Sequence, residues 1–143
     1  MTALWRLSNS QDLLPRARPA GRWHGAGAAV VVLDATPAAA VFARLAQAEV
    51  AHPRALPRNY FLLEVRVPPQ AVADPRPPAA WQTDLQASRA FGNAWLAQGE
   101  ALLLKVPSAA GGCQYLLNAD HPQLAQCPVS YTHLRAHETR EDL

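Results

Sequence analysis

Cysteine is scarce in this sequence, and its scarcity limits the chemistry open to the chain. Among 143 residues only Cys113 and Cys127 are cysteines, and neither has histidine or cysteine neighbours at the spacing of a zinc site. A small scaffold held together by several disulfides is therefore excluded. We expect two ordinary thiols and no metal site.

Long apolar runs and a strong excess of charge are also missing. No apolar run approaches the roughly 18 residues of a membrane-spanning helix, and residues 1–8 lack the basic and apolar segments of a secretory signal. The formal net charge is +2, carried by scattered arginines and by Lys105 alone among the lysines. This pattern disfavours a nucleic-acid-binding stripe and a membrane-binding face. We therefore expect a cytoplasmic protein whose partner is a small molecule or another protein.

The residues that are present favour one compact α+β domain. Half of the chain is apolar, which at 143 residues suffices for a single core. Strands and helices are mixed without a regular βαβ repeat, which favours a small mixed sheet with a few helices over a doubly wound sheet. Short apolar segments bounded by turn formers predict five strands, at residues 3–7, 29–33, 60–67, 101–106 and 114–117.

Two helices are predicted from their ends. Thr36-Pro37 is typical of a helix start, and Pro53 would end that helix. A second helix would begin near Thr83 or Asp84 and end at Gly99. The proline-rich residues 68–78 predict a loop. The side chains expected to face inward are Val41, Phe42, Leu45 and Val50 in the first helix, and Leu85, Phe91, Trp95 and Leu96 in the second.

The last residues are expected to lie outside the domain. Residues 129–139, VSYTHLRAHET, are similar to the conceptual translation of a transposon-derived sequencing adapter. This similarity predicts a domain of residues 1–128, truncated at its C-terminus, followed by an unrelated tail at 129–143. The alternative is a genuine polar helix in which His133 and His137 form a possible metal pair.

Three segments, read in order, resemble one known family. They are LWRLSN at residues 4–9, GRWHGAG at 21–27, and KVPSA with YLLNADHP at 105–109 and 115–122. Together they resemble the RES domain family, over residues 4–122. The resemblance implies a fold related to ADP-ribosyltransferases and a toxin whose antitoxin carries an Xre-type DNA-binding domain. It also implies that NAD⁺ is the substrate, cleaved at its nicotinamide–ribose bond without a separate cofactor.

The resemblance assigns binding roles to four residues. Arg6 and Arg22 match the family's two conserved arginines, whose guanidinium groups would donate paired hydrogen bonds to the pyrophosphate of NAD⁺. Ser108 matches a conserved serine that would contact the ribose or nicotinamide, with an ordinary turn serine as its alternative. Trp23 would stack on the ligand or fill the core, and the core is favoured for a tryptophan considered alone.

Two positions depart from the family pattern. The family places a tyrosine at the end of a strand and a glutamate on the next helix, where this chain has Val32 and Ala43. None of the family's catalytic groups is then intact, and losing one such group commonly costs on the order of 10²–10⁴ in rate. Glu49 lies on another face of the same helix, while Glu64 in the following strand remains an alternative carboxylate.

Two functions from different classes follow from these residues. The first is an NAD⁺-cleaving toxin with weakened catalysis, which the retained Arg6, Arg22 and Ser108 favour. The second is a non-catalytic RES-like protein that binds an antitoxin or a nucleotide, which Val32 and Ala43 favour. Attack by water and attack by phosphate both remain open.

Overall fold

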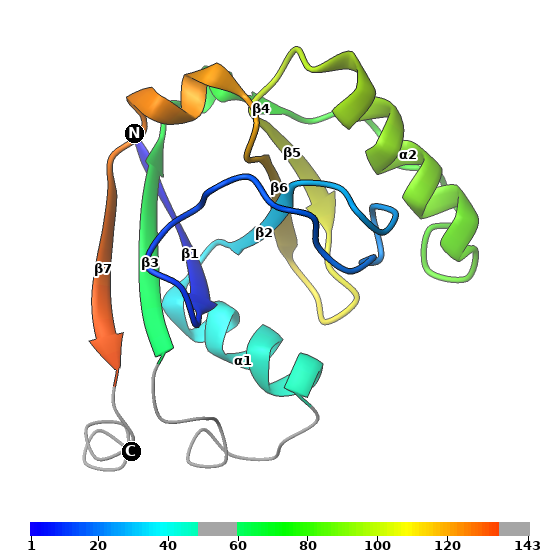
Figure 1. Cartoon of the computed structure of the whole chain (residues 1–143). Helices are drawn as coiled ribbons and strands as arrows, with labels where there is room; N and C mark the ends of the chain where they lie inside the picture. The colour runs from blue at the N-terminus through cyan, green and yellow to red at the C-terminus, as the bar shows by residue number, and fades with distance from the viewer. Residues whose placement is uncertain (49–59, 135–143) are drawn as a thin grey trace.

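The computed structural model describes residues 1–48 and 60–134, and in these ranges the chain forms one seven-stranded mixed sheet with two α-helices (Figure 1). The strand order is β4-β5-β6-β2-β1-β3-β7, and neighbours are antiparallel except β4 and β5. The predicted α+β class is confirmed. The strands are β1 (Thr2–Ser8), β2 (Val30–Asp34), β3 (Tyr60–Val67), β4 (Val72–Ala73), β5 (Leu103–Pro107), β6 (Cys113–Asn118) and β7 (Val129–Leu134).

The five predicted strands are present, and two further strands were not foreseen. The loop predicted for residues 68–78 is wrong in part, because it contains β4, whose Val72 pairs with Leu103 of β5. The prolines stand outside this short strand, so they remove none of its backbone donors. β7 pairs along β3 from Tyr60 opposite Leu134 to Val65 opposite Val129.

β7 bears on the two interpretations of the last residues. Residues 129–134 are a strand, so the alternative of a polar helix is wrong for them. His133 lies on this strand, whereas His137 lies outside the described residues. The similarity of the segment to adapter sequence stays a prediction.

Both predicted helix starts are confirmed. α1 (Pro37–Ala48) begins after Thr36, whose Oγ1 accepts a hydrogen bond from the Ala39 amide at 3.1 Å. α2 (Leu85–Gln98) is capped by the Asp84 carboxylate and ends at Gly99, whose φ of 65° is the left-handed conformation that glycine tolerates. The end predicted at Pro53 and the inward position of Val50 lie outside the described residues. Neither helix, within the ranges described, is long and apolar enough to cross a membrane.

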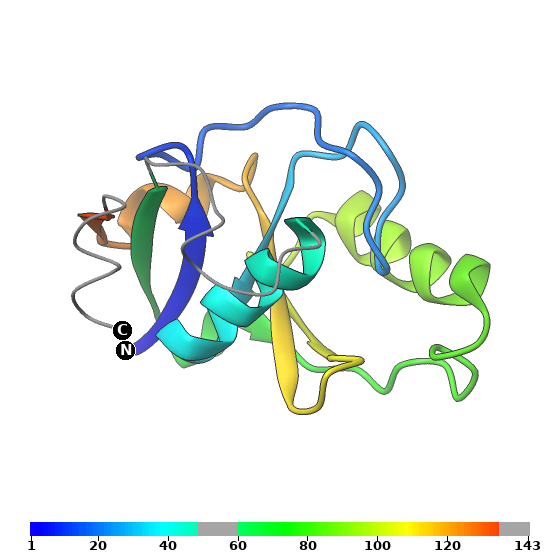
Figure 2. The same cartoon turned by 90° about the horizontal axis from the view of Figure 1, so that it is seen from below.

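Two of the side chains predicted to face inward are exposed instead. Phe42 is 71% exposed, because it lies two residues, or about 200° around the helix, from the buried Ala40. Leu85 is 42% exposed, because the first turn of α2 extends past the end of the sheet, as Figures 1 and 2 show. Trp95 is buried as predicted, and Phe91 and Leu96 pack against its cluster.

The side chains of β2 point alternately into the main core and onto the opposite face of the sheet. Val31 and Leu33 are fully buried in a cluster that includes Leu4 of β1 and Leu63 of β3. Because successive side chains of a strand point to opposite faces, Val30, Val32 and Asp34 share the other face. There Val30 packs under α2 in a second cluster, and Val32 and Asp34 continue along the strand. This second face carries the candidate site.

Candidate functional site

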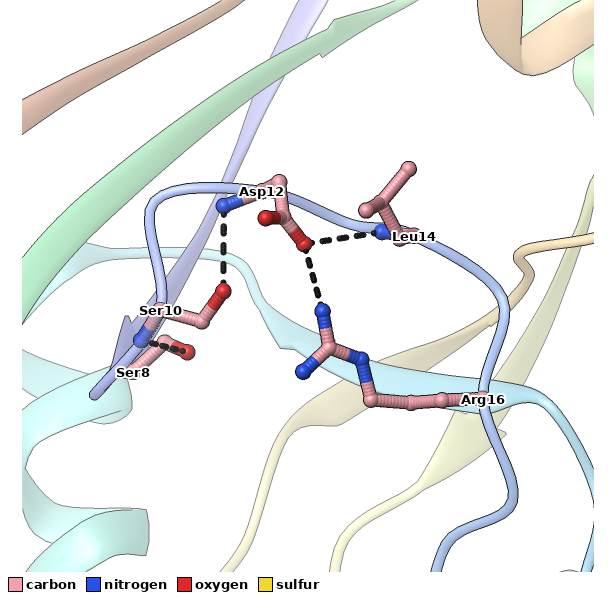
Figure 3. A network of polar contacts seen from close by, with 5 residues as sticks. All are labelled: Ser8, Ser10, Asp12, Leu14 and Arg16. Atoms are coloured by element: carbon pink, nitrogen blue, oxygen red, sulfur yellow. Dashed lines mark hydrogen bonds and ion pairs between the residues drawn. The ribbon is translucent and has the colours of Figure 1, made fainter.

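A series of local hydrogen bonds shapes the chain where it leaves β1 (Figure 3). Ser8 Oγ accepts from the Ser10 amide at 3.1 Å, and Ser10 Oγ accepts from the Asp12 amide at 3.3 Å. Asp12 Oδ1 then accepts from the Leu14 amide at 3.1 Å and from Arg16 Nη2 at 2.8 Å. These bonds give residues 9–29 a defined path without helix or strand, and the segment crosses in front of the sheet in Figure 1.

α2 holds the part of this loop that carries Arg22 and Trp23. Ser88 Oγ donates to the Arg22 carbonyl at 2.6 Å, and Arg89 Nε donates to the Gly21 carbonyl at 2.9 Å. The loop backbone comes so close to α2 that a Cβ on Gly92 would lie 1.7 Å from the Trp23 carbonyl oxygen. Gly92, a poor helix former inside α2, is therefore required at this position by a tertiary contact.

A cavity of about 380 Å³ lies between this loop, α1, β1 and β2. A second cavity of about 690 Å³ adjoins it beneath the turn between β5 and β6. We call the two together the cleft, because they share four lining residues. Each of the two cavities lies within the size range of small-molecule sites, about 300–1,000 Å³. The shared residues are Arg22, Asp34, Ala43 and Gln114.

Four arginines line the first cavity and make it basic: Arg6, Arg18, Arg22 and Arg44. Arg6 Nη1 donates to the Val32 carbonyl at 3.2 Å. Burial is the main reason why the pKa of Arg6 falls to about 10, and the charges of Arg18 and Arg44 lower it further. Its guanidinium nevertheless stays charged at neutral pH. The more exposed Arg22 donates from Nη1 to the Trp81 carbonyl at 3.0 Å and lies over the Trp81 ring.

The two positions that depart from the family pattern face this cleft. Val32 lines the first cavity from β2, and Ala43 lines both cavities from α1. The cleft is thus apolar at the two places where the family has a hydroxyl and a carboxylate. No group of three or more histidine, cysteine or acidic side chains that could hold a metal is found in residues 1–48 and 60–134.

Ser108 and Trp23 border the second cavity. Ser108 lies in the turn between β5 and β6, where its Oγ accepts from the Ala110 amide at 3.2 Å. This contact is the one expected of a turn serine, while the hydroxyl still borders the cavity. Trp23 is buried against Trp81 and Phe91, with ring centroids 5.5 and 5.8 Å away, which agrees with the core interpretation.

Asp34 and Gln114 are cleft residues that were not foreseen. Asp34 is 6% exposed, and its Oδ1 accepts a hydrogen bond from Gln114 Nε2 at 3.0 Å. Burial raises the pKa of Asp34, while this hydrogen bond and the charge of Arg6 oppose the rise. A signal for Asp34 existed, because a residue two places after Val32 on a strand shares its face. Gln114 had none, since it enters through the pairing of β2 with β6.

The remaining titratable residues separate into those near the cleft and those away from it. His24 lines the first cavity, and burial lowers its pKa. Glu64, the alternative carboxylate, pairs with Arg66 at 3.2 Å on β3 and lines neither cavity. Glu49 lies outside the described residues.

Comparisons with known proteins agree on one family. The family model described as "RES domain" matches residues 3–138. "Toxin Res" of Pseudomonas putida KT2440 is 36% identical over 133 residues, which cover 88% of this chain and 90% of that protein. The crystal structure of the M. tuberculosis MbcT–MbcA toxin–antitoxin complex contains a chain of the same fold, with a TM-score of 0.73 and 21% identity, over 98% of this chain and 87% of that one. This chain therefore belongs to the RES domain family.

Proposed function

We propose that this chain is the toxin of a toxin–antitoxin module, that it binds NAD⁺ in the cleft, and that it cleaves the nicotinamide–ribose bond slowly. The observation that carries the proposal is the convergence of four arginines from β1, the long loop and α1 on one cavity. The similarity to the P. putida protein named "Toxin Res" supports the toxin assignment. The cytoplasm, where NAD⁺ is abundant, is the proposed place of action.

The energetics of Arg6 favour an anionic ligand. A buried guanidinium is costly unless a negative charge pairs with it. Asp34 interacts with Arg6 by its charge, yet the two form no ion pair within the described residues. A pyrophosphate in the cavity would supply the missing anion and would accept paired hydrogen bonds from the guanidinium groups. Arg6 and Arg22 are the proposed anchors, with Arg18 and Arg44 contributing charge.

The low rate follows from what the cleft lacks. Val32 has no hydroxyl with which to orient a ligand, and Ala43 has no carboxylate to stabilise a developing positive charge. Ser108 borders the second cavity, where it would contact ribose or nicotinamide. The cleft is therefore better equipped to bind NAD⁺ than to cleave it.

Incubation of the full chain with NAD⁺, followed by chromatography of nicotinamide, tests this function. We expect slow release above a buffer control in the parent chain and none in Arg6→Met. Arg66→Met is the matched control, because Arg66 is an exposed strand arginine that lines neither cavity. A parent chain that releases no nicotinamide above buffer contradicts the proposed cleavage.

The second candidate is a non-catalytic protein that binds an antitoxin or a nucleotide, and the apolar Val32 and Ala43 favour it. The solved complex that shares the fold is a toxin bound to its antitoxin, and we propose an Xre-type antitoxin as the partner here. Co-expression with the product of the adjacent gene should yield a stable complex. A chain that purifies alone after co-expression argues against this partner.

A further inference from the structure

Cleavage of the nicotinamide–ribose bond places positive charge on the ribose, and a neighbouring carboxylate stabilises such oxocarbenium-like states. Of the described residues that line the cleft, Asp34 provides the one carboxylate. It lies at the end of β2, on the same face as Val32, and it borders both cavities. The position is therefore open to a ligand that spans the cleft.

We propose that Asp34 is the catalytic carboxylate of this chain, and that it acts from β2 in place of the carboxylate that Ala43 does not provide. This inference rests on the proposed NAD⁺ cleavage. It assigns a reactive role to a residue that the motif comparison leaves without one.

In the part of the chain that the structure describes, one carboxylate oxygen of Asp34, Oδ1, is held by a hydrogen bond, and the other, Oδ2, is not. Gln114 on the paired strand β6 donates to Oδ1 at 3.0 Å, which helps to orient the carboxylate. Within the described residues Oδ2 accepts no side-chain or backbone hydrogen bond. Oδ2 is not one of the buried polar atoms that lack a partner among the described residues, so it is accessible from the cleft. A ligand in the cleft would replace solvent at this oxygen.

The surrounding charges keep Asp34 suited to this role. The charged and titratable side chains that share its two cavities are Arg6 from β1, Arg44 from α1, Cys113 from β6, and Arg18, Arg22 and His24 from the loop. Burial raises the pKa of Asp34, and the charge of Arg6 and the Gln114 hydrogen bond limit that rise. Burial therefore disfavours the charged form of Asp34, while the neighbouring cation and the hydrogen bond favour it.

The proposed step uses water as its co-reactant. The bond between ribose C1′ and the nicotinamide nitrogen breaks, and its electron pair goes to that nitrogen. The water oxygen bonds to C1′, and one water proton passes to the Asp34 carboxylate and from there to solvent. The products are nicotinamide, ADP-ribose and one proton, and nothing is oxidised or reduced.

Asp34→Asn tests the inference, because the amide keeps the shape of the side chain and its ability to accept from Gln114. We expect nicotinamide release to fall by on the order of 10²–10⁴, to the buffer background if the parent rate is low. The NAD⁺ dissociation constant measured by calorimetry should change by less than about fivefold. Glu64→Gln is the matched control, a carboxylate-to-amide change outside the cleft, and it should keep the parent rate. A parent rate in Asp34→Asn overturns the inference and leaves the proposed function standing.

Two further measurements test the role of Asp34 independently. Ala43→Glu added to Asp34→Asn should restore release, since position 43 lines the same cavities; a folded double variant without release counts against the inference. The parent rate should fall as pH drops through the raised pKa of Asp34, whereas Asp34→Asn, which retains His24 and is assayed at an enzyme concentration that lifts its release above the buffer background, should lack this acidic limb. A limb unchanged in the variant would assign it to His24 instead and overturn the role of Asp34. If the parent chain releases no nicotinamide at any pH, the proposed function fails and this inference fails with it.

Discussion

Arg6, the proposed NAD⁺ anchor, lies where burial disfavours its charge. Its pKa of about 10, below the ordinary 12.5, means that the folded state disfavours the charged form. The resulting cost is fully present at neutral pH and is relieved only as pH rises above about 10. The proposed binding of an anion would offset this cost.

Arg6→Met should therefore raise the free energy of unfolding while it removes NAD⁺ binding. We expect a gain of about 1–3 kcal/mol at pH 7, because an apolar side chain of similar volume replaces an unpaired buried charge. Urea denaturation and calorimetry measure the two effects. Arg66→Met, at an exposed site, should change stability by less than about 0.5 kcal/mol. A large loss of stability in Arg6→Met would show that its hydrogen bond to Val32 matters more than its burial.

Val32→Tyr combined with Ala43→Glu should convert the cleft into a faster enzyme. Both positions line the first cavity, so the new hydroxyl and carboxylate would reach a bound ligand. Nicotinamide release should rise by on the order of 10²–10⁴. Val32→Tyr with Ala38→Glu is the control, since Ala38 is an exposed residue of α1 that lines neither cavity. Equal rates in the two double variants would mean that position 43 does not act on the ligand.

At the scale of elements, α2 acts as the support of the arginine-bearing loop. Gly92→Ala should lower the free energy of unfolding by about 1–3 kcal/mol, because a Cβ there collides with the Trp23 carbonyl and forces the loop away. NAD⁺ affinity should fall with it, as Arg22 moves with that backbone. Ala94→Gly, on the exposed side of α2, should cost about 1 kcal/mol through helix propensity and leave the affinity unchanged. Unchanged affinity in a folded Gly92→Ala variant would separate the loop from binding.

Local patterns predicted most elements because each depends on neighbours in the chain. The alternation in Tyr60–Val67 and the caps at Thr36, Asp84 and Gly99 correspond to the observed strand and helices. The sequence did not predict β4, because its two residues form a strand only through their pairing with β5. Phe42 and Leu85 were misplaced because a helical pattern does not say which face meets the sheet, or how far the helix extends beyond it.

The residues of the candidate site could be located in part from the sequence for the same reason. Arg6, Arg22 and Ser108 came from ordered motifs, and the structure places all three at the cleft. Asp34 could have been found by following the alternation of β2 from Val32. Gln114 could not, because it lies 80 residues from Asp34 in sequence and meets it only across paired strands.

At the scale of the whole molecule, ligand binding should appear as added stability. If NAD⁺ binds only the folded chain, a concentration of 100 times its dissociation constant adds about 2.7 kcal/mol to the free energy of unfolding. The melting temperature followed by circular dichroism should rise with NAD⁺ in the parent chain and stay constant in Arg6→Met. A rise of equal size in both would place the bound NAD⁺ elsewhere on the molecule.

The junction between β1 and β2 has a mechanical consequence. The two strands pair at Trp5 opposite Asp34, whereas β1 pairs with β3 along its whole length. In Figure 2, β1 and β3 stand to one side and α2 lies at the opposite end. Apolar packing spans this junction on one face, and the cleft spans it on the other. A molecule bound in the cleft would contact both strands of this short junction, and we expect it to slow amide hydrogen exchange in β1 and β2.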